Sequence, residues 1–266
     1  MFQKLNIKLS HIIPNRHILF MDSKASSSSE IKPPMADELL EHYTVDQLRM
    51  HFIALGLSSK STGFKPQAFI EEDLVSKENN YTTNEEDLIK DIVLKEGNLL
   101  TNVFNRLIRS CFYTTQTYYA GKIPSGKISE KIKNLAQKKV FEYEKHMYNH
   151  EFHRISYVID EYIREVNKYW AGQIRLSEKN NDLVLRTQTL IDAFYSCKVM
   201  SILIHPIAPK GCEMFATYLN IDSKIWDWNY IFEPIEYYIE DLAKHEIRLL
   251  EPRIDFFSKL ESQYRK

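Results

Sequence analysis

The chain of 266 residues is long enough for one large domain or two small ones. Its 44% apolar and 27% charged residues are typical of a soluble globular protein, and its formal net charge of -1 means that any nucleic-acid contact must come from a local basic patch. Three cysteines without CxxC spacing support neither a disulfide framework nor a zinc knuckle. No apolar run reaches the roughly 20 residues that a membrane span needs. We therefore expect a cytoplasmic protein without a membrane anchor.

The first part of the chain combines two short apolar runs with a serine cluster. The runs at residues 12–13 and 18–21 predict one or two strands, which are too few for a sheet that is stable alone. The four serines at 26–29 predict a polar loop. This part is therefore expected to be a small strand-containing remnant.

Two helices are expected next, one opening at Asp37 and one over residues 45–57. Thr44 begins a capping box for the second helix, because a glutamine follows three positions later. Residues 58–69 are predicted to be irregular, and residues 71–86 to form a polar surface loop with some helix.

From residue 88 onward, apolar residues recur every three or four positions, and proline and glycine mark the breaks. Five helices joined by short breaks are predicted, and such an arrangement makes a helical bundle. A tail then begins at Trp226 and ends in a short helix near Tyr264. The fold class is therefore mainly α. The expected helices span residues 88–120, 128–148, 150–176, 183–205 and 210–219.

Asn105 and Arg109 lie one helical turn apart in the first of these helices. Residues at i and i+4 share one helical face, so an amide and a guanidinium stand side by side. The amide can donate and accept hydrogen bonds and the guanidinium is a forked donor, so together they can read an unpaired base and a neighbouring phosphate. The alternative is that both are ordinary polar residues on a solvated face.

A basic run near the start of the second long helix is a candidate for contacts with a phosphate backbone. The alternative, about equally weighted, is a solvated helix face. The lysines in question are Lys127, Lys131, Lys138 and Lys139.

Three histidines, His146, His150 and His153, are spaced on one helical face. No carboxylate or cysteine completes a ligand set at fixed spacing, so a surface cluster is expected and no metal site is assigned.

Several motifs, in order, resemble those of methionyl-tRNA synthetases, from about residue 22 to the C-terminus. Lys24-Ala-Ser-Ser-Ser28 is similar to the Lys-Met-Ser-Lys-Ser loop of that family, without its methionine and second lysine. Tyr43-Thr-Val-Asp-Gln-Leu-Arg49 resembles the Tyr-x-x-Asp-x-Leu-Arg that opens a stem-contact fold. Asn98-Leu-Leu-Thr-Asn102, followed by Asn105 and Arg109, resembles the anticodon helix. Two later motifs, Asn167-Lys-Tyr169 and His205-Pro-Ile-Ala-Pro209, complete the series.

This resemblance implies an anticodon-binding helical bundle of class I aminoacyl-tRNA synthetases. It implies three units: residues 1–31 as a remnant of the catalytic domain, 32–87 as the stem-contact region and 88–266 as the anticodon-binding domain. The implied function is tRNA(Met) anticodon recognition within a methionine–tRNA ligase. The implied partners are tRNA(Met) and a catalytic domain, with no DNA and no membrane.

Two departures from the family pattern matter. The His-Ile-Gly-His signature that holds ATP is absent. This chain alone is therefore expected to carry no cofactor and to have no ligase activity. In a complete enzyme, ATP and Mg would act in the catalytic domain, and Lys24 would face the triphosphate. The family tryptophan that stacks on an anticodon base corresponds to a position near Leu176. Trp170 lies about two turns too early, and Arg175 is a second candidate for stacking.

Three other functions stay open on the sequence. The chain can be a free-standing tRNA-binding module or paralogue, or a helical interaction domain that does not bind RNA. It can also be the anticodon domain of another class I synthetase, such as those for cysteine, leucine or valine.

Overall fold

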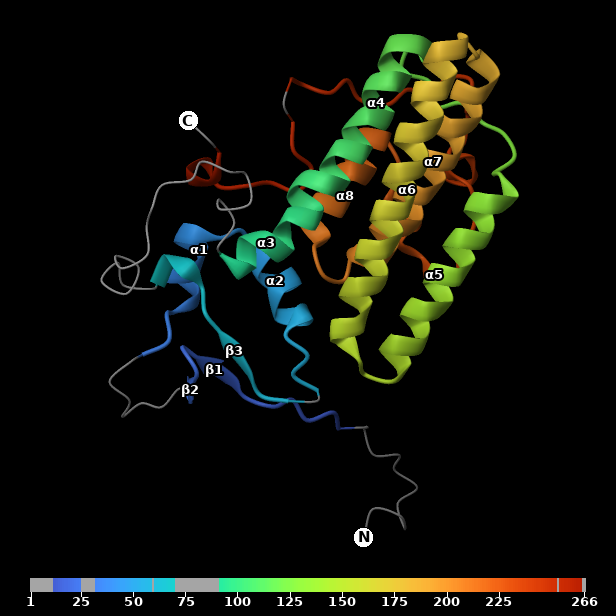
Figure 1. Ribbon diagram of the computed structural model, residues 1–266. Helices are drawn as coiled ribbons and strands as arrows, with labels where there is room; N and C mark the ends of the chain where they lie inside the picture. Colours follow the sequence, from blue (N-terminus) through green and yellow to red (C-terminus); the bar gives the residue numbers. More distant parts are fainter. Residues whose placement is uncertain (1–11, 25–31, 59, 70–90, 253, 265–266) are drawn as a thin grey trace, which may run out of the picture.

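The computed structural model describes residues 12–24, 32–58, 60–69, 91–252 and 254–264. It consists of a small strand-and-helix unit beside a bundle of long helices (Figure 1). The mainly helical fold class is confirmed. The unit boundaries expected at residues 31 and 87 stay predictions, since both lie outside the described ranges.

The small unit is built on a three-stranded sheet in the order β2-β1-β3. β1 runs antiparallel to β2 and parallel to β3, with Leu19 opposite Gly63 in the parallel pair. The strand predicted at 18–21 is confirmed, whereas residues 12–13 are not in a strand and β3 lies where the sequence predicted irregular chain. Its elements are β1 (Ile18–Phe20), β2 (Ser23–Lys24), α1 (Ala36–His42), α2 (Val45–Ala54), β3 (Thr62–Phe64) and the 3-10 turn η2 (Gln67–Phe69).

The helix expected over residues 88–120 is a continuous rod with a π-helical segment in it. α3 (Ile92–Asn98) leads into the π segment η5 (Leu99–Phe104), which leads into α4 (Asn105–Tyr119). The Asp91 carboxylate accepts hydrogen bonds from two backbone N–H groups of the first turn and so fixes where the rod begins. The rod ends at Ala120, whose φ of 51° takes the chain out of the helix.

The other helices of the bundle are α5 (Glu130–Tyr148), α6 (Phe152–Asn180), α7 (Leu183–Ile204) and α8 (Pro209–Leu219). α7 is the central helix, because it packs against α4, α5, α6 and α8. Every residue from 189 to 204 is buried, which explains its nearly continuous apolar sequence. Within the described ranges, no helix combines the length and hydropathy required to cross a membrane.

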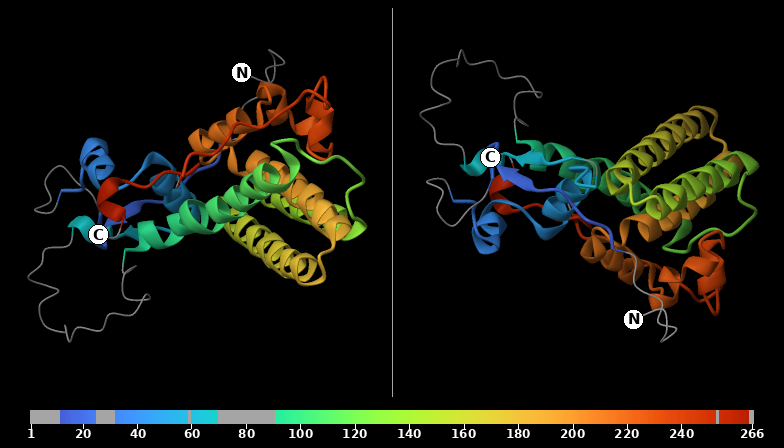
Figure 2. Two further views of the ribbon diagram at one scale, coloured as in Figure 1. Left: turned by 90° about the horizontal axis from the view of Figure 1, so that it is seen from above. Right: turned by 90° about the horizontal axis from the view of Figure 1, so that it is seen from below.

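The C-terminal tail returns along the bundle to the small unit (Figure 2). It runs beside α4 and α8 and ends near α1 and α2, where the Gln263 side chain donates to the His42 carbonyl at 2.8 Å. The Phe257 ring packs directly on Gly211, and a side chain at position 211 would clash with this ring. The helix expected near Tyr264 is a single turn. The tail's 3-10 turns are η6 (Ser223–Trp226), η7 (Trp228–Tyr230), η8 (Ile235–Tyr238) and η9 (Glu261–Gln263).

Lys198 of α7 anchors the first half of this tail from inside the core. Its side chain is fully buried, and its ammonium donates to the Ile231 carbonyl at 2.5 Å. The rings of Tyr195 and Tyr238 face it at 5.4 and 5.7 Å, close enough for cation–π contact. Burial lowers the pKa of Lys198 to about 7, although the charge of Glu233 opposes this shift.

This depressed pKa predicts how stability depends on pH. The unfolded chain binds a proton at Lys198 that the folded chain has lost, so the free energy of unfolding rises with pH from about 7 toward 10. Relative to Lys198→Met, we expect the wild type to gain on the order of 1 kcal/mol per pH unit across this window. Urea unfolding at a series of pH values measures it. The exposed Lys145→Met is the matched control, and an equal pH slope in all three proteins would contradict the expectation.

Candidate nucleic-acid interface

Asn105 does not face solvent. Its side chain is 0% exposed and forms a two-way amide bridge with the tail. Its Nδ2 donates to the Phe257 carbonyl at 2.9 Å, and its Oδ1 accepts from the Phe257 N–H at 3.0 Å. The prediction that Asn105 reads a base is corrected here, because in this structure its donors and acceptor are already satisfied by backbone.

Arg109 shares the face of Asn105, as the helical spacing predicted, and this face is covered by the same tail. Its Nη1 lies 2.8 Å from the Asp255 carboxylate, whose other oxygen accepts from the Tyr264 hydroxyl at 2.7 Å. Arg109 is partly exposed, whereas the Asp255 side chain is mostly buried. The structure therefore brings Asn105 and Arg109 together, but as anchors of the C-terminal tail.

The outward face of the same rod presents another amide and guanidinium at the same spacing. Asn102 lies in the π segment η5 and Arg106 in the first turn of α4. Arg106 is exposed, Asn102 is partly exposed, and the Arg106 Nη2 lies 3.4 Å from the Asn102 Oδ1. Asn98 is one turn earlier and also partly exposed. Sequence reasoning missed this pair, although the i, i+4 spacing was present in the same motif.

The candidates for base stacking on α6 differ in accessibility. Trp170 is buried in the bundle core, so its predicted role as a stacking platform is corrected to core packing. Arg175 is exposed, and the adjacent Leu176, which stands near the family's tryptophan position, is 44% exposed. The role of Arg175 stays a prediction.

Lys139 is not available to a phosphate. It is buried between α5 and α6, with its ammonium 2.6 Å from Glu161 and 3.3 Å from Glu142. Burial lowers its pKa, but the hydrogen bond to Glu161 and the charge of Glu142 outweigh this and raise it overall. The predicted contact of Lys139 with the tRNA phosphate backbone is therefore corrected to an ion-pair cluster between α5 and α6. Glu165 completes this cluster, with its carboxylate 3.9 Å from the Lys139 ammonium.

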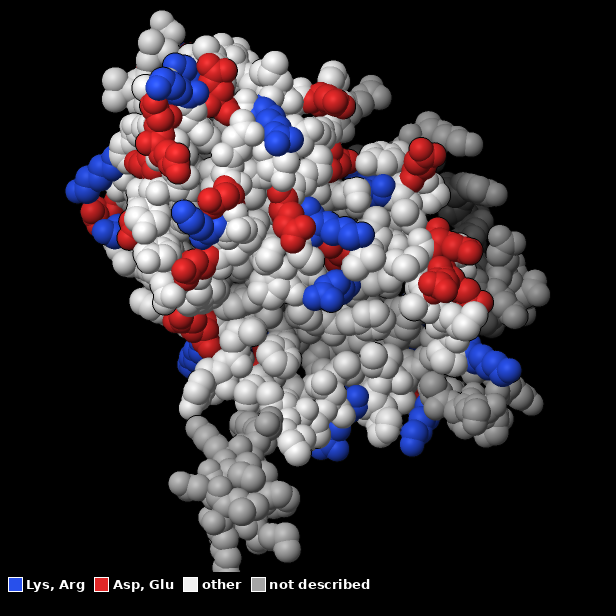
Figure 3. Space-filling model, turned by 180° about the vertical axis from the view of Figure 1, so that it is seen from behind, with Lys and Arg blue, Asp and Glu red and all other residues white. Residues whose placement is uncertain are grey.

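The remaining basic residues are accessible. Lys127, Lys131 and Lys138 are exposed, with Lys127 3.6 Å from Glu130 and Lys138 3.9 Å from Glu142. Lys131 lies 5.5 Å from the Tyr169 ring. The face shown in Figure 3 mixes acidic and basic side chains without a continuous basic surface. Contacts of these lysines with RNA stay a prediction.

Lys24 ends β2 and is exposed, but residues 25–31 of its loop lie outside the described ranges, so its catalytic role stays a prediction.

In the predicted histidine cluster, His146 Nδ1 pairs with Glu151 at 2.8 Å. The described residues contain no group of three or more histidine, cysteine or carboxylate side chains placed to hold a metal ion.

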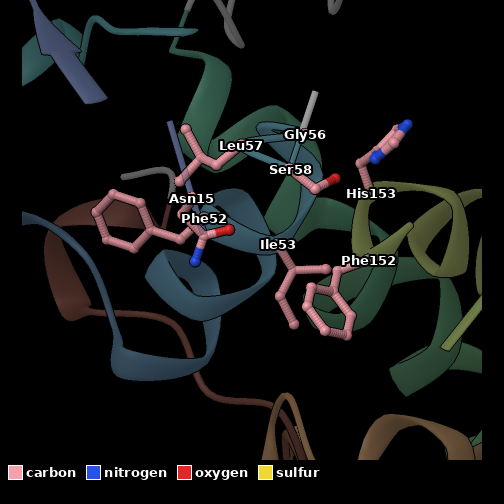
Figure 4. A pocket seen from close by; sticks show the side chains of 8 residues that line it. All are labelled: Asn15, Phe52, Ile53, Gly56, Leu57, Ser58, Phe152 and His153. Atoms are coloured by element: carbon pink, nitrogen blue, oxygen red, sulfur yellow. The ribbon is translucent and has the colours of Figure 1, made fainter. Parts of the chain in front are cut away.

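A cavity of about 200 Å³ lies between the end of α2 and the start of α6 (Figure 4). Its walls are mostly apolar, including Phe52, Ile53 and Phe152, and the His153 ring points away from them. Its volume is below the roughly 300–1,000 Å³ of typical ligand pockets, so we assign no ligand to it.

Comparison with known proteins gives a consistent set of relatives, although no protein-family model matches the chain. Methionine–tRNA ligase 1 of Alkaliphilus oremlandii is 22% identical over 247 residues, which cover 88% of this chain and 41% of that protein. A methionine–tRNA ligase of Bacillus anthracis is 21% identical over 217 residues, which cover 82% of this chain and 36% of that protein.

Solved structures agree. Mycobacterium tuberculosis methionyl-tRNA synthetase bound by methionyl-adenylate matches 91% of this chain and 43% of its own, with a TM-score of 0.62 and 15% identity. Its free form gives a TM-score of 0.61 and 16% identity, over 86% and 40% of the two chains. The fold is thus similar to that of a mainly helical part of these methionyl-tRNA synthetase structures. The chain is methionyl-tRNA synthetase-like, as its motifs predicted, and it spans about two fifths of the length of the curated relatives it matches.

The two asparagines provide a matched test of the anchoring role. We expect Asn105→Ala to lower the free energy of unfolding by about 2–3 kcal/mol, because it leaves the buried N–H and carbonyl of Phe257 unpaired. Asn102→Ala, on the exposed face, is expected to cost less than about 0.5 kcal/mol. Urea unfolding followed by circular dichroism measures both, and equal effects would contradict the assignment.

Proposed function

We propose that this chain binds tRNA(Met) through the outward face of η5 and α4, and that Asn102 and Arg106 contact unpaired anticodon bases. The observation that carries the proposal is a partly exposed amide and an exposed guanidinium, one turn apart on the same face of the rod. It is supported by relatives that are named methionine–tRNA ligases.

The chemistry of the pair suits an RNA loop. The Asn102 amide can donate to and accept from one base edge, while Arg106 supplies a planar fork that stacks on a base or binds a phosphate. The rod is held from behind by the bridge between Asn105 and Phe257, so the pair is positioned before RNA arrives. Such preorganisation lowers the ordering cost of binding.

Other predicted contacts extend this proposal. Lys127 and Lys131 are accessible for phosphates near the start of α5, and Arg175 for a stacked base on α6. In a complete ligase, ATP and Mg would act in the catalytic domain, where the Lys24 loop would neutralise triphosphate charge. The bound tRNA would then be charged with methionine by that domain.

Binding to an anticodon stem-loop tests the proposal directly. We expect Arg106→Ala to weaken binding of a CAU stem-loop about 5- to 100-fold, because a base or phosphate contact of this kind contributes about 1–3 kcal/mol. Fluorescence anisotropy with labelled RNA measures the loss. Lys145→Ala is the control, being exposed on α5, and a stem-loop with a changed anticodon should bind wild type more weakly. Equal binding of both stem-loops, or no effect of Arg106→Ala, would reject the proposed site.

The chain alone is expected to be catalytically inactive. Its described sheet has strands of two or three residues, whereas a nucleotide-binding fold needs a parallel sheet of several strands. Methionine-dependent ATP–pyrophosphate exchange should therefore stay at the background rate. A clear rate, lost on Lys24→Ala, would show that the chain activates methionine.

A further inference from the structure

The tail segment of residues 227–241 lines the outside of α5 and α7 with a preformed set of exposed aromatic rings. Ile231 and Ile235 within the segment, and Ile225 just before it, are buried and fix it on the bundle. Lys198 holds the Ile231 carbonyl from inside. Because its backbone is anchored at these points, the segment presents its other side chains in a defined arrangement rather than as a mobile loop.

The exposed rings are arranged in pairs. Tyr230 and Tyr237 stack at 5.2 Å with an interplanar angle of 26°, and they are 41% and 52% exposed. Tyr238 meets Tyr237 edge-on, and its hydroxyl donates to the Tyr230 carbonyl at 2.8 Å, which fixes the pair. On the neighbouring helix, Phe141 is 59% exposed and forms a T-shaped pair with Phe232. A group of aromatic rings that stays exposed marks an interaction surface.

The charged side chains of the segment 227–241 itself are all acidic, whereas Lys138 and Lys145 of α5 lie on the helix face of Phe141. Asp227 and Glu233 are exposed and lie near Tyr237. Burial and the neighbouring Tyr230 make the largest contributions to the raised pKa of the Tyr237 phenol, and the charges of Glu233 and Asp227 raise it further. Glu144 of α5 accepts from the Trp228 indole at 2.9 Å, which places a third carboxylate at the same surface. None of the three forms a salt bridge with another described residue.

From this combination we infer that the surface formed by residues 227–238 binds an arginine- or lysine-bearing peptide segment of a protein partner. Guanidinium and ammonium groups bind the faces of tyrosine rings, and these carboxylates, two of which accept hydrogen bonds but none of which forms a salt bridge among the described residues, complement their charge. A nucleic acid or an anionic lipid surface would be repelled by the same carboxylates. The surface is therefore distinct in chemistry from the Asn102 and Arg106 face and does not depend on the tRNA proposal.

Labelled peptides test the inference on the full chain. An oligo-arginine peptide is expected to bind more tightly than an oligo-lysine peptide of equal length, since guanidinium stacks on tyrosine, and an oligo-glutamate peptide is not expected to bind. We expect Tyr237→Ala to weaken oligo-arginine binding about two- to fivefold. Glu233→Gln should weaken it similarly and reduce its dependence on salt. Fluorescence anisotropy measures all three effects.

Two controls on other surfaces make the result specific. Tyr157→Ala removes an exposed tyrosine of α6, and Glu178→Gln neutralises an exposed carboxylate near the end of the same helix. Both should bind oligo-arginine like wild type, and the Tyr237 and Glu233 variants should bind the CAU stem-loop like wild type. The inference is overturned if oligo-arginine does not bind, if the controls weaken binding as much as the site variants, or if Tyr237→Ala has no effect.

Discussion

The position of the C-terminal tail depends on one buried amide. Asn105 of α4 bridges both the N–H and the carbonyl of Phe257, 152 positions later in the chain, without any access to solvent. A buried amide with satisfied partners is stabilising, whereas the same amide without the tail would be left unpaired at a cost of about 1–3 kcal/mol for each orphaned group. The tail therefore has one position in which these groups are paired. From there it also reaches α2 through Gln263 and Gln47, and so adds to the direct packing of α2 on α3 and α6 that holds the small unit on the bundle.

The helices could be predicted from the sequence because their signals are local. Apolar spacing and breaks at proline and glycine located α5, α7 and α8 to within one or two residues, although α6 continues four residues beyond its expected end. The candidate site could be predicted only in part. The spacing of Asn105 and Arg109 gave their shared face correctly, but it contains no information about what covers that face. Asp255, Phe257 and Tyr264 cover it, and these contacts join residues roughly 150 positions apart, so no local pattern reports them.

Charge shows the same limit. Lys138 and Lys139 are neighbours in a basic run, yet one is exposed and the other is enclosed by carboxylates from α5 and α6. A helix turns by about 100° per residue, so adjacent residues have different surroundings. A count of lysines therefore overstates the surface available to a phosphate backbone. In a chain with a net charge of -1, the positions of the exposed cations, rather than their number, decide where an anionic partner is attracted.

The tail has two halves with separate anchors, and this separation has a functional consequence. Lys198 holds the half near Ile231 against α7, whereas Asn105 and Arg109 hold the half near Phe257 against α4. The half near Ile231 presents tyrosines and carboxylates. The half near Phe257 supports the rod, whose opposite face carries Asn102 and Arg106. Because the anchors lie on different helices, neither surface needs the other to be occupied in order to form. In the two proposals, a cationic peptide and an RNA loop would therefore occupy separate faces of the chain, each supported by a different helix of the bundle.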